Sequence, residues 1–107
     1  MPSYPGPARV VLDFAEGTVT LAAAERARIG AGLGGMGLQP EARLLICAYG
    51  STTASSRRTA YLRALTVRAA LIDLGWPAGY VTLRIAVSAD SAVVSIAAQS
   101  PGMDCSA

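Results

Sequence analysis

The sequence predicts an α/β two-layer sandwich, in which a mixed sheet carries two helices on one face. Short apolar runs rich in β-branched residues predict four strands, and two longer segments place apolar residues at helical spacing. The elements follow in the order β-α-β-α-β-β, which favours packing of both helices against one face of a single sheet. The chain has 107 residues, which is near the usual size of one domain.

The first half of the chain predicts an arm, a strand and a helix. Residues 1–7 contain three prolines and a glycine and predict an extended arm, and the apolar run at residues 8–15 predicts the first strand. A helix is expected from residue 21, where one face carries four apolar residues: Leu21, Ile29, Leu33 and Met36. Five glycines between residues 30 and 37 weaken its last turns, which we expect to fray or to lie close against a neighbouring element.

The middle of the chain predicts a second strand and a second helix. Residues 42–50 are too apolar to alternate, which is typical of a strand covered on both faces or central in a sheet, and residues 51–56 form a polar loop. The helix expected within residues 55–75 has a stripe of five apolar residues, Ala60, Ala64, Val67, Leu71 and Leu74, widened by Tyr61, Leu65 and Ile72. Gly75 is the expected C-terminal cap of this helix.

The last part of the chain predicts two more strands and a tail. Residues 80–87 predict a third strand, and residues 92–99 predict a fourth that pairs back on it after a tight turn at residues 88–91. Residues 101–107 are expected to be a tail. The predicted domain therefore spans residues 8–100.

Composition excludes several classes of function. Nine arginines, no lysine and seven acidic residues give a net charge of only +2, and the few aromatic residues are scattered, so nucleic acid is not an expected partner. The absence of histidine removes Ser/His/Asp and Cys/His nucleophiles and most zinc and non-haem iron sites. We therefore expect a non-catalytic protein with no cofactor and no metal site.

The two cysteines and the amino terminus bear on compartment. Cys47 is expected to be a buried apolar residue and Cys105 a free thiol in the tail; a disulfide between them in an oxidising compartment is the alternative. The proline-rich start does not match a signal peptide, and no apolar run is long enough to span a membrane. The chain is then either cytoplasmic or a domain of a longer exported protein.

Residues 63–75, RALTVRAALIDLG, carry the pattern RAxxVxxxLxxxG. This pattern resembles the second helix of the OmpA-like, peptidoglycan-associated domain family. The run LLICAYG at residues 44–50 is similar to the central strand of that family, and the apolar face of the first helix is similar to its counterpart. The resemblance covers roughly residues 9–87 and implies an OmpA-like domain of the periplasm or outer membrane.

The resemblance also implies a ligand, the stem peptide of peptidoglycan, gripped at its diaminopimelate residue. In that family an aspartate after the central strand holds the ligand's ammonium group, and the helix arginine pairs with its carboxylate. Arg63 takes the place of that arginine and is the expected anchor. Ser51 stands where the aspartate is found, so Ser51 or Thr52 is expected to be a weaker partner.

Other interpretations of these residues stay open. Arg63 can instead be a solvated helix residue or one that braces a loop through its carbonyl groups. Arg57 and Arg58 lie in the first helical turn, where the helix dipole favours acids; they are surface charges, or Arg58 contacts an anionic ligand. If ligand binding is lost, the chain is a structural or protein-interaction subunit, and a partner or another copy covers the sheet face away from the helices.

Overall fold

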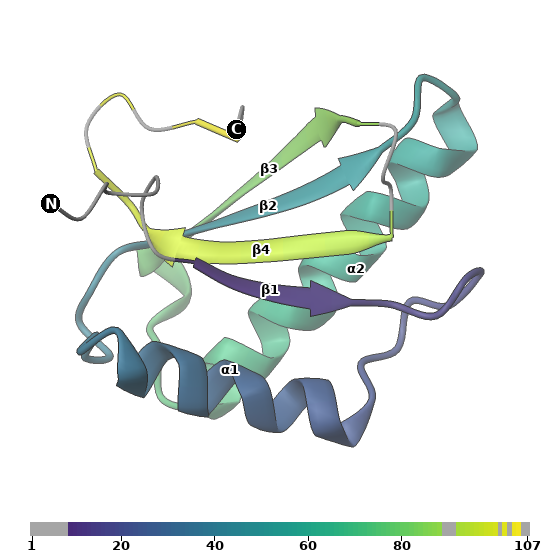
Figure 1. Cartoon of the computed structure of the whole chain (residues 1–107). Helices are drawn as coiled ribbons and strands as arrows, with labels where there is room; N and C mark the ends of the chain where they lie inside the picture. The colour runs from purple at the N-terminus through teal and green to yellow at the C-terminus, as the bar shows by residue number, and fades with distance from the viewer. Residues whose placement is uncertain (1–8, 89–91, 101, 103, 106–107) are drawn as a thin grey trace, which may run out of the picture.

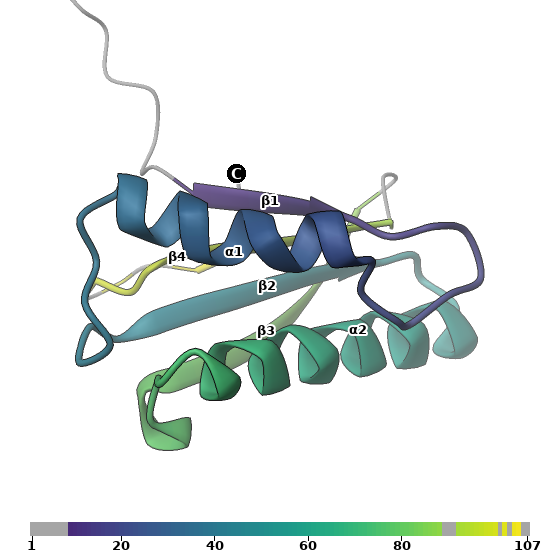
Figure 2. The same cartoon turned by 90° about the horizontal axis from the view of Figure 1, so that it is seen from below.

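Two helices lie on one face of a four-stranded sheet in the computed structural model of the protein (Figures 1 and 2), which describes residues 9–88, 92–100, 102, 104 and 105. The elements are β1 (Arg9–Asp13), α1 (Ala23–Gly35), β2 (Leu44–Gly50), α2 (Ala54–Asp73), a 3-10 turn (Ala78–Tyr80), β3 (Val81–Val87) and β4 (Val93–Ala98). The predicted fold class and element order are confirmed. The expected arm at residues 1–7, most of the tight turn at residues 88–91 and part of the tail lie outside the described residues.

The strand order of the sheet is β1-β4-β2-β3, with β2 and β3 parallel and both neighbours of β4 antiparallel to it. The prediction that the fourth strand pairs back on the third is therefore wrong. β4 lies between β1 and β2 because four consecutive residues of it, from Val94 to Ala97, are buried and need cover on both faces. β3 takes the sheet edge, where Ile85 and Val87 are exposed.

The predicted central position of the second strand is confirmed. β2 is buried at every residue except Tyr49, which is partly exposed, and it lies between β4 and β3. Its residues Leu44, Ile46 and Ala48 face the helices and belong to the main core together with the buried residues of β1 and β4.

The first helix packs against β1 through the apolar face that the sequence predicted. Ile29 and Leu33 are fully buried, and Leu21 and Met36 pack against the core. The helix lies close to β1 at Gly32, because a Cβ placed there would lie 2.5 Å from Cγ2 of Val10. The expectation of a close neighbour at the glycine-rich end is confirmed at this residue.

The second helix buries a narrower stripe than predicted. Ala60, Ala64, Val67 and Leu71 are buried, whereas Tyr61, Ile72 and Leu74 are exposed. Tyr61 and Ile72 lie about a quarter of a turn or more from the centre of the stripe, beyond the reach of the sheet, and Leu74 follows the last residue of α2. Gly75 has a φ of 108° and caps the helix as predicted, with the Trp76 amide donating to the Leu71 carbonyl at 3.0 Å.

The other face of the sheet is partly covered by the chain itself. A disulfide joins Cys47 of β2 to Cys105, so the expectation of a free thiol at Cys105 is wrong. Strand alternation points Cys47 away from the helices, so its bond holds Cys105 on that face. Leu45, Cys47 and Cys105 form a second small cluster, and the Tyr49 hydroxyl donates to the Cys105 carbonyl at 3.2 Å. These residues supply part of the cover that the sequence left to a partner or another copy.

Candidate functional site

The predicted site residues lie at one end of the sheet. β1 and β2 run in the same direction, since each is antiparallel to β4, and both helices begin at the end where these strands finish (Figure 1). Ligands of α/β sheets typically bind beyond the carboxyl ends of the strands. Ser51 and Thr52 follow β2 directly, and Arg58 lies near the start of α2.

The loop between β2 and α2 is ordered by its own hydroxyl groups. Thr53 is the N-cap of α2, and its side chain accepts from the Ser56 amide at 3.2 Å. The Ser51 amide donates to the Ser56 hydroxyl at 2.7 Å, and the Ser51 and Thr53 hydroxyls lie 3.3 Å apart. Thr52 is exposed at the tip. The loop therefore presents fixed hydroxyl groups beside the first turn of α2.

That first turn is cationic. Residues 54–57 contain no acidic residue, and Arg57 and Arg58 are both exposed. Unpaired amide groups at a helix N-terminus already favour negative charge, and two arginines add to this field. The arrangement attracts an anion.

Arg63 is buried and holds the loop between β1 and α1. Its side chain is 5% exposed, Nε donates to the Thr18 carbonyl at 2.7 Å, and Nη2 donates to the Ala15 carbonyl at 3.3 Å. Its guanidinium carbon lies 5.3 Å from the centre of the Phe14 ring. The Thr66 hydroxyl reinforces the contact by donating to the Val19 carbonyl at 2.8 Å. These contacts are those of a residue that braces a loop.

The structure does not bring Arg58 and Arg63 to one place. Five residues of helix turn the side chain direction by about 140°, so Arg58 faces solvent while Arg63 faces the core. Ser51, Thr52 and Arg58 share the start of α2, and Arg63 contacts a different loop.

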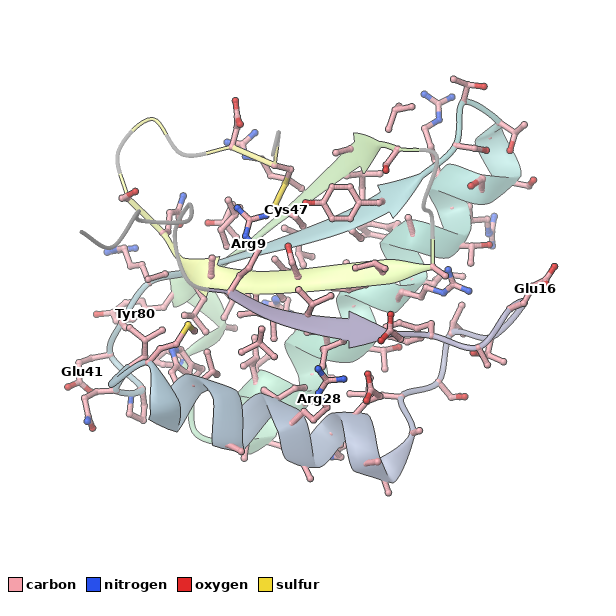
Figure 3. The ribbon with its side chains drawn as sticks, in the orientation of Figure 1. Arg9, Glu16, Arg28, Glu41, Cys47 and Tyr80 are labelled. Carbon is pink, nitrogen blue, oxygen red and sulfur yellow. A yellow bond between two sulfur atoms is a disulfide. The ribbon has the colours of Figure 1, made fainter. Side chains whose placement is uncertain are left out.

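Two acidic residues of the segment that follows β1 lie at this end of the molecule. Glu16 is exposed in the loop that Arg63 braces and points outward (Figure 3). Glu25, in the first turn of α1, accepts from the Asp13 amide at 2.8 Å, and this hydrogen bond, helped by Arg28, lowers the pKa of its carboxyl. The family resemblance placed the acid after the central strand, at Ser51, whereas Glu16 follows β1. Both positions lie at the same end of the sheet because β1 and β2 run in the same direction.

The described residues show neither a metal-binding cluster nor a membrane-spanning helix. Among them, no three histidine, cysteine, aspartate or glutamate side chains are placed to hold a metal ion. No helix in the described part of the chain is long and apolar enough to cross a membrane.

Comparison with solved structures identifies the fold. The structure described as the OmpA-like domain of FopA1 from Francisella tularensis subsp. tularensis SCHU S4 is similar to this chain with a TM-score of 0.61. The similarity covers 82% of this chain and 69% of that one, with 16% identical residues.

The chain has an OmpA-like fold. The fold indicated by the helix pattern at residues 63–75 is therefore confirmed. No protein-family model matches the chain, and no curated protein matches its sequence. At 16% identity the OmpA-like fold is shared, and no ligand follows from the likeness.

Proposed function

We propose that this chain is a non-catalytic binding module of the bacterial cell envelope, which binds a carboxylate of the peptidoglycan stem peptide weakly. The observation that supports this proposal is the cationic start of α2, with exposed Arg58 in the helix that begins after the ordered hydroxyls of Ser51 and Thr53. It lies at the edge of the sheet where β1 and β2 both end, in an OmpA-like fold.

Each predicted site residue has a distinct role in this proposal. Arg58 supplies the exposed guanidinium that pairs with the carboxylate, and Ser51 and Thr52 offer hydroxyl groups to the rest of the peptide. Arg63, the predicted anchor, contributes by fixing the loop that carries Glu16. Ser51 also meets the ligand's ammonium group, while Glu16 stays exposed on the separate loop that Arg63 braces.

Weak affinity follows from Ser51. A hydroxyl group can accept from an ammonium group but does not neutralise its charge. Losing a charge-assisted hydrogen bond costs about 1.5–3 kcal/mol, or about ten- to a hundredfold in affinity. Restoring the acid at this position should recover part of that loss.

The test is co-sedimentation with purified diaminopimelate-type peptidoglycan. The parent should bind, Arg58→Gln should bind less, and Ser51→Asp should bind more tightly. Arg26→Gln is the matched control, because it removes the same charge from an exposed arginine of α1 that pairs with exposed Asp73. A parent protein that does not sediment with peptidoglycan, or equal losses in Arg58→Gln and the control, would refute the proposal.

A second candidate function is a structural or protein-interaction subunit that uses the same fold without a ligand. It is favoured by exposed apolar residues on α2 and on the edge strand β3. On α2, Tyr61 is 48% exposed and Ile72 is also exposed. On β3, Val87 is 62% exposed and Ile85 is also exposed. Tyr61 and Ile72 lie roughly a third of a turn around α2 from Asp73, which pairs with α1. They therefore share the side of the helix away from α1.

This second candidate predicts association. An edge strand offers unpaired backbone groups, and an apolar side next to it is typical of an interface. Sedimentation velocity of the purified protein should show self-association that Val87→Asp weakens. A monomer at every concentration, together with peptidoglycan binding, would remove this candidate.

A further inference from the structure

We propose that the sheet face away from the helices carries a second binding site, for the phosphate or carboxylate group of a small molecule. A hollow of about 640 Å³ lies there, lined by polar side chains: Arg43, Thr82, Arg84, Gln99, Ser100 and Asp104. It is separate from the cationic start of α2 and does not depend on the function proposed above.

The sheet register explains how these side chains meet. Arg84 of β3 pairs with Cys47 of β2, whose side chain points to the face covered by the carboxy-terminal residues. Thr82 lies two residues before Arg84 and Arg43 four residues before Cys47, so strand alternation places both on that face. The site is therefore built at the amino ends of β2 and β3, away from the β2–α2 loop.

Two of the donors are held in place by the protein. The guanidinium of Arg43 lies over the Tyr80 ring, 4.7 Å from its centre. Figure 3 shows Tyr80 at the end of the sheet where β2 and β3 begin. The Gln99 side chain accepts from the Thr82 hydroxyl at 3.0 Å, which leaves the amide NH₂ of Gln99 as a donor. The Gln99 backbone amide donates to the Arg43 carbonyl at 2.8 Å and ties the two residues together.

The charges of the hollow select an anion. Among its described lining residues, two arginines outweigh one acid, Asp104. Arginine presents a planar set of donors that fits a carboxylate or a phosphate, and a serine hydroxyl adds another donor. Because both groups bind arginine by the same geometry, the shared chemistry is an oxyanion. The volume leaves room for the molecule that carries it.

The disulfide completes the site. Gly102 and Asp104 line one side of the hollow, and Asp104 directly precedes Cys105 in the chain. Cys105 is fixed over the sheet by its bond to Cys47 and by the hydrogen bond from the Tyr49 hydroxyl. The variant Cys47→Ala/Cys105→Ala releases that wall and should weaken binding.

The experiment is a titration of the whole protein with inorganic phosphate and, separately, with the dicarboxylate glutarate, followed by backbone amide chemical shifts at low ionic strength. At least one probe should bind saturably with a Kd of about 1 mM or tighter and shift the amides of Thr82 and Gln99. Arg84→Gln should weaken binding about tenfold or more. Preference for one probe assigns the ligand as a phosphate or a carboxylate.

The matched control is Arg26→Gln, which removes the same charge from an exposed arginine of α1 on the other face of the sheet. This variant should bind the probes as the parent does. Failure of both probes to saturate, or equal weakening by Arg84→Gln and Arg26→Gln, would overturn the proposal. The amide spectra show in the same experiment that each variant is folded.

Discussion

Replacing Arg63 by alanine is expected to destabilise the fold strongly. The side chain is 5% exposed and donates to the carbonyls of Thr18 and Ala15 at 2.7 Å and 3.3 Å. A hydrogen bond to a charged group contributes about 1.5–3 kcal/mol, and the longer of these two belongs at the low end of that range. Because part of the loop can be solvated after the change, we expect a loss of about 3 kcal/mol, or roughly 150-fold in the folding equilibrium.

Urea denaturation followed by circular dichroism measures this loss, with the m-value checked for a two-state transition. Arg58→Ala on the exposed side of the same helix should change stability by no more than about 0.5 kcal/mol. Arg63→Lys should fall between the two alanine variants, because lysine keeps the charge without the two-pronged geometry. A loss of stability below about 1 kcal/mol in Arg63→Ala would refute the bracing role and favour ligand binding as the role of Arg63.

Three further predictions test the packing, the covalent link and the pH response. Gly32→Ala should lower the stability of the fold by about 1–3 kcal/mol, because its new Cβ would lie 2.5 Å from the stiff side chain of Val10. Gly34→Ala should instead raise the stability by about 0.5–1 kcal/mol, since a Cβ there would meet no described atom within 4 Å apart from the nearby helix backbone. Thermal unfolding of the pair checks the opposite signs. Cys47→Ala/Cys105→Ala should lower stability by about 2–4 kcal/mol, because the bond closes a loop between residues 58 apart; urea midpoints equal to the parent would contradict this. The pKa of Glu25 is lower in the folded state than its ordinary value of 4.5, so its contribution is present above that value and is lost as pH falls through the lowered pKa. The stability advantage over Glu25→Gln should shrink over that acid range, and a constant difference in urea titrations would exclude the linkage.

Local patterns in the sequence predicted the fold well. The stripe of Ala60, Ala64, Val67 and Leu71 indicated both the helix and its buried face, and Gly75 indicated where it ends. The apolar run of β2 indicated a central strand. These features succeed because helix and strand periods repeat within a few residues, so neighbouring positions carry the signal.

Contacts between distant residues were beyond such patterns. The position of β4 between β1 and β2, in place of a hairpin with β3, depends on which faces of three strands need cover. The bond between Cys47 and Cys105 depends on the path of the chain after β4. Neither has a local signature.

The candidate site shows the same contrast between local sequence patterns and contacts of distant residues. The sequence pointed to Arg63, Arg58, Ser51 and Thr52, and it left open whether Arg63 meets a ligand or braces a loop. Spacing along one helix cannot show that the guanidinium contacts carbonyl groups about 45 residues earlier in the chain, because those groups come near only when β1 and α2 pack together.

By itself, the sequence determined the element order, the OmpA-like helix pattern, and the lack of histidine, which removes histidine general bases and Ser/His/Asp nucleophiles. The tertiary structure alone decided that Arg63 is enclosed, that Arg43 and Arg84 share a hollow, and that the carboxy-terminal residues close one side of it. The reason is physical: propensity and periodicity act over a few residues, whereas burial and charge clustering arise when segments distant in sequence pack together.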